Sequence, residues 1–233
     1  MASHAIITAQ GRREATGTMT CAVHLRDGNG SLMDGTYLIS CLHVLALAQE
    51  YYPDFAPGAS VLTPNDSKVV AHATEHRGFL IDQYLHSFDA AIARVVDDEA
   101  LKQLVPPARP KDFISSPAQI PSLYMIQVPD REPIVASSRR ILRSDQLSIP
   151  YRRGTSMERL RVWHRCIVES ACAGEKSTVG GDSGSPVVSL NGDTLIGMHI
   201  AGAGNLSYLI PAFDLLDPAN YYGLSSRGRI HLA

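Results

Sequence analysis

Gly180-Gly181-Asp182-Ser183-Gly184-Ser185-Pro186 is the stretch that most constrains this chain, and the apolar pair Val187-Val188 follows it. A serine hydroxyl is a weak nucleophile, so it needs a nearby base, a group that orients the base, and donors for a developing oxyanion. The glycines allow a turn in which the amides of Gly181 and Ser183 point at one spot. An isolated Gly-x-Ser is more often a plain turn, but the whole heptapeptide is more specific.

Short apolar and β-branched runs, separated by turn signals, lie on both sides of this stretch. Asn191-Gly192 stands between two such runs and favours a type I′ hairpin turn. Val44–Tyr51 and Pro211–Leu216 have the composition of short helices. Many short strands at close spacing indicate an all-β sandwich or barrel. The expected strands are Thr18–Leu25, Thr36–Leu42, Ser60–Leu62, Val69–Ala73, Ala90–Val95, Leu123–Val128, Ile134–Ser138, Leu147–Tyr151, Val162–Glu169, Pro186–Leu190 and Thr194–Ile200.

A proline-rich segment separates the strands into two groups. Residues 101–122 contain five prolines, which is typical of a connection between domains. We therefore expect an N-terminal β unit at residues 16–105, a linker at 106–122, a C-terminal β unit at 123–212 and a C-terminal segment at 213–233. The length of 233 residues is enough for two small β units that share a core.

The composition excludes several classes of function. Only 19% of the residues are charged and the formal net charge is −2, so nucleic acid is not an expected partner. No stretch approaches the ~20 apolar residues of a membrane helix, and no signal-peptide pattern is present, so a cytoplasmic location without a membrane partner is expected. The four cysteines form no CxxC pair, which gives no indication of zinc and favours buried reduced thiols. They are Cys21, Cys41, Cys166 and Cys172.

Three segments together resemble a known family. Gly181–Pro186 resembles the nucleophile motif of the chymotrypsin/trypsin-like serine peptidases. Tyr37–Leu45 is similar to the segment that carries their catalytic histidine, and Phe88–Ile92 to their Asp-Ile-Ala-Leu segment. The resemblance spans residues 16–212 and is specific at these three motifs.

The resemblance implies a fold and a mechanism. The fold is a double antiparallel β-barrel, with six strands in each barrel, the catalytic groups in the cleft between them and a short C-terminal helix. His43, Asp89 and Ser183 follow the family's order at separations of 46 and 94 residues. They would act as general base, orienting acid and nucleophile toward a protein or peptide substrate. The amides of Gly181 and Ser183 would bind the oxyanion, and no metal or cofactor is implied.

Each triad residue has a simpler explanation when it is taken alone. His43 lies among apolar neighbours and could be an ordinary core histidine. Asp89 could be a turn or cap residue, and three other acids compete for its role, namely Asp82, Asp97 and Asp98. The joint match of three segments in order and at spacing favours the triad.

Further positions bear on substrate preference. Trypsin-like members of the family carry an aspartate where this chain has Ser177, so a preference for Lys or Arg is not expected. Thr178 and the Gly-x-His ending at His199 resemble glutamyl endopeptidases and viral chymotrypsin-like proteases, which recognise Glu or Gln. A hydroxyl and an imidazole N–H can both donate to such a side chain. Three strand residues would pair with the substrate backbone, namely Ile200, Ala201 and Gly202. The alternative is that all these positions are ordinary strand residues.

The chain departs from the zymogen-type members in two ways. No Ile-Val-Gly-Gly start follows a cleavage site, so Asp182, which pairs with the new terminal amine in those members, needs another partner. Leu42 replaces the small residue usual before the histidine. These differences favour a member that is either constitutively assembled or activated by a partner protein.

Two other functions are alternatives to that of a peptidase. An esterase of the α/β-hydrolase type is disfavoured because the chain lacks the full GxSxG elbow and the Ser-acid-His order of that fold. A catalytically silent or latent interaction module on the same scaffold is the second alternative, since a fold does not guarantee activity. Such modules usually lose a triad residue, and all three are present here.

Overall fold

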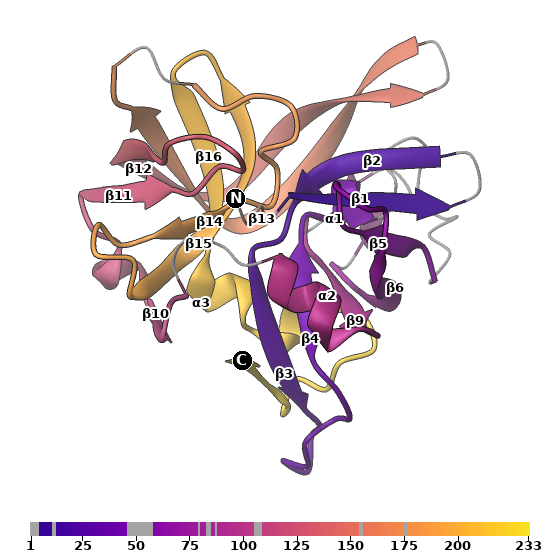
Figure 1. The fold of residues 1–233 in the computed structure, drawn as a ribbon. Coiled ribbons are helices and arrows are strands. Elements are labelled where there is room, and N and C mark those ends of the chain that lie inside the picture. Colours follow the sequence, from indigo (N-terminus) through magenta and orange to yellow (C-terminus); the bar gives the residue numbers. More distant parts are fainter. Residues whose placement is uncertain are drawn as a thin grey trace.

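The computed structural model describes residues 5–10, 13–45, 58–78, 80–82, 85–86, 88–104, 109–153, 156–174 and 177–233. Strands dominate this part of the chain and form two sheets, each built mainly from one half of the sequence (Figure 1). Within it, we find no helix with the length and apolar character needed to cross a membrane.

The second sheet closes into a six-stranded barrel. Its strands pair antiparallel in the order β15-β14-β11-β12-β13, and β16 closes the ring because it pairs with both β13 and β15. The bounds are β11 (Leu123–Ile126), β12 (Ile134–Arg153), β13 (Ser156–Cys172), β14 (Pro186–Val188), β15 (Thr194–Ala203) and β16 (Leu206–Pro211).

The first sheet has eight strands in the order β17-β3-β4-β9-β6-β5-β1-β2. Five central strands are joined by the N-terminal hairpin β1-β2 and by β17 from the end of the chain, so this sheet has two strands more than the six expected. The bounds are β1 (Ala5–Gln10), β2 (Arg13–Thr18), β3 (Cys21–Arg26), β4 (Tyr37–Ser40), β5 (Ser60–Leu62), β6 (Val69–Arg77), β9 (Ala91–Val95) and β17 (Arg229–Leu232).

Smaller elements connect the two sheets. β7 (Leu80–Asp82) and β8 (Leu85–His86) join the second sheet through parallel pairing of β8 with β13, and β10 (Asp112–Phe113) pairs parallel with β15. The helices are short: α1 (Leu42–Leu45), α2 (Asp98–Gln103), α3 (Ala212–Leu215), and the 3₁₀ turns η1 (Pro117–Gln119) and η2 (Pro218–Asn220). The expected C-terminal helix is confirmed by α3.

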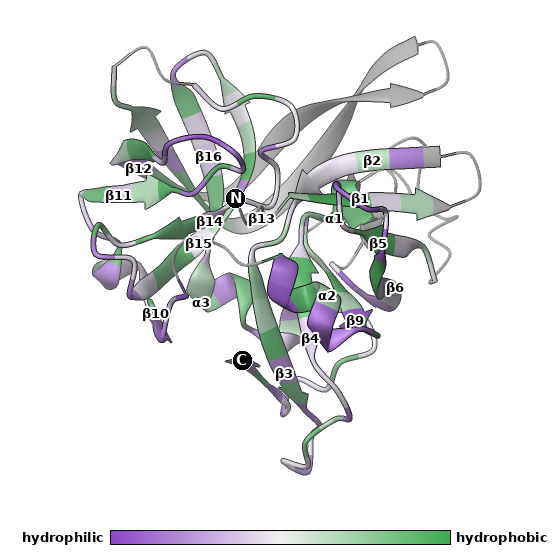
Figure 2. Cartoon of the chain, in the orientation of Figure 1, coloured by the Kyte–Doolittle hydropathy of each residue, from purple (hydrophilic) through white to green (hydrophobic). Residues whose placement is uncertain are grey.

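One continuous hydrophobic cluster runs through both halves. It includes Ile6 and Leu38 of the first sheet and Ile126 and Ile210 of the barrel, all buried. Figure 2 shows the same distribution, with apolar strands inside and polar faces such as that of α2 outside. Strand β3 alternates buried and less buried residues, as its sequence predicted. The shared core fixes the two sheets against each other, so residues from both can build one site.

Several local expectations differ from the structure. His43 does not end a strand but lies in α1, because β4 stops at Ser40. The expected helix Val44–Tyr51 falls mostly outside the described residues. The hairpin at Asn191-Gly192 exists, but only Gly192 has a positive φ, so its turn is not type I′, which needs two such residues. Strands β12 and β13 pair from Ala136–Cys172 out to Arg153–Ser156, a hairpin far longer than the separate short strands expected there.

Candidate active site

His43 and Asp89 form a two-point contact within the first half. The Asp89 carboxylate accepts from the His43 backbone amide at 3.0 Å and from its Nδ1 at 2.7 Å. Asp89 is 1% exposed and stands just before β9, whereas His43 lies in α1 with 15% of its side chain exposed. The two bonds fix both the position of the imidazole and its tautomer, which leaves Nε2 to face other groups.

The two residues that flank Asp89 are held by other segments of the chain. The ring of Phe88, its neighbour, meets Tyr221 edge-on at a centroid distance of 5.6 Å, and Gly78 N–H donates to the carbonyl of Ala90 at 2.9 Å. Of the competing acids, Asp97 caps α2 and pairs with a lysine, and Asp98 begins that helix. The side chain of Asp82 lies outside the described part of the chain.

Asp89 also determines whether the His43 imidazole favours its protonated or its neutral form. Burial alone would lower the pKa of His43, but the charge of Asp89 and its hydrogen bond outweigh burial and raise that pKa above its ordinary value. The imidazolium form is therefore stabilised, which a base needs while it holds a proton.

The Ser183 loop is anchored to the first half through its carbonyl groups. Thr18 N–H donates to the Ser183 carbonyl at 2.8 Å, and Thr18 Oγ1 donates to that of Gly181 at 2.9 Å. Thr20 Oγ1 donates to the carbonyl of Gly184 at 2.6 Å. Gly184 has φ +93°, and a Cβ there would lie 2.0 Å from the Thr18 carbonyl oxygen. Only glycine fits this crossing between the halves.

The same crossing brings the His43 segment to the Ser183 loop. A Cβ built on Gly17 would lie 2.5 Å from Val44, the residue after His43, and 3.0 Å from the Ser183 carbonyl oxygen. The three residues His43, Asp89 and Ser183 thus come from neighbouring segments. Within the described part of the chain, Ser183 Oγ donates to the carbonyl of Ile200 at 3.4 Å and makes no hydrogen bond to His43.

The backbone amides of the loop differ in whether they have an acceptor. Asp182 N–H, Gly184 N–H and Ser185 N–H each donate to a backbone carbonyl. In the described part of the chain, the amides of Gly181 and Ser183 have no such acceptor. These are the two amides that the sequence predicted as oxyanion donors.

His199 lies buried beneath the expected substrate pocket. It is 2% exposed, and its Nδ1 makes a 2.8 Å hydrogen bond with Ser207 Oγ. Burial lowers the pKa of His199 to about 4, so its imidazole is neutral at pH 7. Ser207, which fixes the orientation of this ring, was not found from the sequence because β16 itself was not expected.

Thr178 and the end of β15 complete this region. Thr178 Oγ1 is buried and has no hydrogen-bond partner among the described groups. A Cβ on Gly202 would lie 2.0 Å from that oxygen, so the threonine packs directly on the strand. β15 pairs with β14 only as far as Met198, while β16 covers its other side. The edge at Ile200–Gly202 is therefore open to a further strand.

The sequence model of one family, Trypsin, matches residues 8–213. The chain belongs to the trypsin family. This agrees with the order of the three motifs and with the closed barrel. No curated protein matches the chain in sequence.

One solved protease structure shares the fold of this chain, and other protease structures are similar to it at lower scores. Protease A of Thermobifida fusca has a TM-score of 0.55 at 13% identity, over 97% of this chain and 96% of that one. A Glu endopeptidase gives a TM-score of 0.46 at 16% identity, over 91% and 87% of the two chains. The inactive form of the Rv3671c protease gives 0.47 at 18% identity, over 91% and 84%.

Asp182 has a charged partner within the described part of the chain. Its carboxylate is 3% exposed and accepts from the Arg131 guanidinium and, at 2.7 Å, from the Val179 amide. Arg131 lies between β11 and β12. The sequence predicts a partner for Asp182 but does not identify it, because nothing in the sequence distinguishes Arg131 from the other arginines.

The four cysteines form no disulfide, and all four are buried. Cys41 is the one that lies at the candidate site. Burial and the charge of Asp89 raise the pKa of Cys41 well above its ordinary value, so it is a neutral thiol. Its Sγ lies within 4.8 Å of ligand atoms of His43 and Asp89. His43 Nδ1 and the Asp89 carboxylate are already hydrogen-bonded to each other. The three side chains therefore form the immediate surroundings of the His43 imidazole.

Proposed function

We propose that this trypsin-family chain is a serine endopeptidase in which Ser183 attacks the scissile carbonyl. The observation that carries the proposal is the two-point His43–Asp89 contact, adjacent to a loop that carries amides without an acceptor among the described residues. A buried carboxylate that orients an imidazole is the arrangement that turns a nearby hydroxyl into a nucleophile. The fold alone would not support this, because fold and function are separable.

The chemistry then runs through an acyl-enzyme. Ser183 Oγ leaves the weak 3.4 Å bond to Ile200 by rotation about χ1 and gives its proton to His43 Nε2 as the C–O bond forms. The amides of Gly181 and Ser183 would hold the oxyanion, and each such donor is worth about 3 kcal/mol of barrier. His43 returns the proton to the leaving amine as the C–N bond breaks, and water then hydrolyses the ester by the same steps.

One observation favours the latent alternative, namely that Ser183 donates to Ile200 and not to His43. A fluorophosphonate probe distinguishes the two, because it reacts only with an activated serine. We expect labelling of the wild type and none of Ser183→Ala or His43→Ala. Ser185→Ala is the matched control, since its buried hydroxyl has no partner among the described groups. Wild-type protein that stays unlabelled would favour the latent module.

We further propose a preference for Glu or Gln before the scissile bond. The buried, unpartnered hydroxyl of Thr178 lacks an acceptor, and the neutral His199 can donate from Nε2 once Ser207 donates to its Nδ1. Profiling with a peptide library should peak at Glu or Gln. His199→Ala should lower that peak more than cleavage after Leu, and a wild-type profile led by Arg or Phe would refute the pocket.

Two further proposals concern the partner of Asp182 and the boundaries of the domains. We propose that Arg131 replaces the zymogen-type amine as partner of Asp182, so that an activating protein would act elsewhere in the molecule. The division at residues 16–105, 106–122, 123–212 and 213–233 would be tested by limited proteolysis, which should cut first within the linker.

A further inference from the structure

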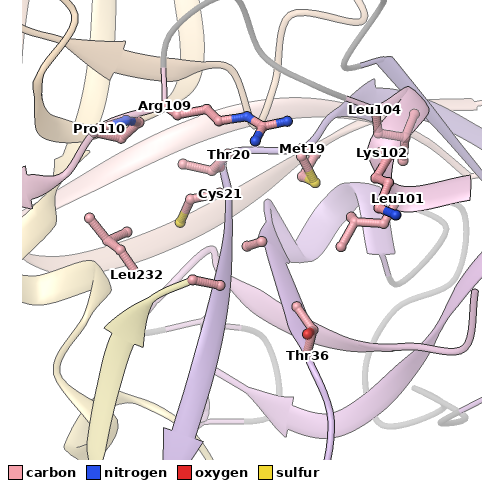
Figure 3. Close-up of a pocket in the computed structure, with 12 residues that line it drawn as sticks. Met19, Thr20, Cys21, Thr36, Leu101, Lys102, Leu104, Arg109, Pro110 and Leu232 are labelled. Carbon is pink, nitrogen blue, oxygen red and sulfur yellow. The ribbon is translucent and has the colours of Figure 1, made fainter. Parts of the chain in front are cut away.

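A second cavity lies apart from the candidate active site. Its volume is about 260 Å³, and its walls come from the start of β3, from α2, from Arg109-Pro110 and from the end of β17 (Figure 3). None of its lining residues belongs to the triad, the oxyanion amides or the Thr178–His199 pocket. Thr36, just before β4, also lines it, so five separate segments meet here and the cavity is a feature of the folded chain and not of one loop.

The walls are mainly apolar. Eight of the twelve lining residues are Met19, Cys21, Ala22, Leu101, Leu104, Pro110, Leu232 and Ala233. Burial raises the pKa of Cys21 to about 12, so this thiol is a neutral, apolar part of the wall. An apolar cavity of about 150 Å³ takes a benzene ring. The larger cavity here therefore has room for a substituted ring or a short alkyl chain.

The charged side chains among the described residues of the lining carry the same sign. They are Lys102 and Arg109, both exposed, and no acidic side chain is among those residues. Lys102 is engaged by Glu99 at 2.6 Å. Arg109 has no hydrogen bond or ion pair with any other described residue, and in Figure 3 its side chain runs from Pro110 toward Met19 and Thr20. A free guanidinium above an apolar cavity is suited to a carboxylate, which it can hold with two bonds.

We propose that this cavity binds a small apolar monocarboxylate, with its tail between Met19, Leu104 and Leu232 and its carboxylate on Arg109. Binding is independent of the proposed peptidase function, but the structure links the two sites. Thr20 lines the cavity and donates to the Gly184 carbonyl beside Ser183. The wall at Met19–Cys21 continues from Thr18, which holds the Ser183 and Gly181 carbonyls. An occupied cavity thus supports the segment that anchors the nucleophile loop.

Calorimetric titration of the full chain with octanoate tests the site. Octanol and octylammonium share the tail and serve as ligand controls. We expect octanoate to bind roughly tenfold more tightly than either, because only it gains the charge-assisted bonds. Arg109→Gln should remove that advantage and leave octanol binding unchanged. Arg227→Gln, an exposed arginine outside the cavity, is the matched control and should bind octanoate as the wild type does.

A second variant separates the cavity from the surface charge. Ala22→Leu fills the space and should abolish binding of octanoate and octanol together. If Ala22→Leu does not fold, Arg109→Gln still tests the proposal. Arg109 is exposed and makes no hydrogen bond or ion pair with the described residues, so its replacement should not affect folding. The proposal is overturned if octanoate does not bind the wild type, or if octanol binds equally well and Arg109→Gln changes nothing. Neither result depends on whether Ser183 is reactive.

Discussion

The two halves of the molecule each bury one histidine at the site, and they shift its pKa in opposite directions. His43, in the first half, faces the Asp89 carboxylate, which raises its pKa. His199, in the barrel, has the neutral hydroxyl of Ser207 at Nδ1, and burial, which outweighs the charge of Asp182 and a backbone hydrogen bond with Tyr208, lowers its pKa to about 4. Both rings have a hydrogen-bond partner at Nδ1. The partner's charge, and not burial alone, therefore decides which histidine can hold a proton.

This difference is consistent with the different tasks that we propose for the two rings. A base must become a cation during the reaction, so it needs a fixed negative charge beside it. A residue that recognises Glu or Gln works as a neutral donor on a rigid strand. In both cases the neighbouring residue, Asp89 or Ser207, determines the role as much as the histidine does.

The largest expected effect that distinguishes His199 from His43 is a change in the free energy of unfolding with pH. The folded-state pKa of His199 is about 4 against an ordinary 6.5, so the unfolded chain binds more protons between these values. The free energy of unfolding should therefore fall by about 3 kcal/mol as pH drops from 6.5 to 4. His199→Gln should lose this dependence, measured as the wild-type minus variant difference in urea unfolding.

His43 should make the free energy of unfolding depend on pH with the opposite sign and in a different pH window. Because its folded pKa is raised, its contribution is complete below 6.5 and is lost as pH rises through the raised value. His43→Gln should remove that alkaline loss and leave the acid window unchanged. If His199→Gln is too unstable to measure, an NMR titration of the wild-type ring replaces it. A His199 that titrates near 6.5 would contradict the comparison.

Much of the site could be predicted from the sequence because its chemistry resides in short local motifs. The Ser183 heptapeptide and the flanks of His43 and Asp89 are each readable within a few residues, and the β pattern around them predicted the fold class. The family match and the closed barrel confirm that class. Period-two patterning also located most of the short strands.

What could not be predicted depends on contacts between residues far apart in the chain. Arg131 and Asp182 are 51 residues apart, and Tyr221 reaches Phe88 from the C-terminal segment, which had no assigned role. Strands β1, β2 and β17 have weak patterns and acquire their structure by pairing with other strands. Ser207 was missed for the same reason. Such pairings follow from the tertiary fold, which local propensity does not encode.

A smaller effect tests whether the first half, and not the barrel alone, holds the nucleophile loop. Thr20→Val removes the donor to the buried Gly184 carbonyl and should cost about 1–2 kcal/mol of stability, because that carbonyl is left unsatisfied. The displaced loop should also react with a fluorophosphonate roughly tenfold more slowly, since small misplacements of reacting groups cost rate. Unfolding and labelling rates are measured on the same preparation.

Thr8 provides the matched control for this change. It is equally buried in the first sheet, but its Oγ1 has no hydrogen-bond partner among the described groups. Thr8→Val should therefore be neutral or slightly stabilising and should leave labelling unchanged. Equal effects of the two substitutions would mean that valine is simply poorly accommodated in this sheet. Slower labelling with Thr20→Val alone would establish that a residue remote from the triad, on the opposite half, controls where Ser183 stands.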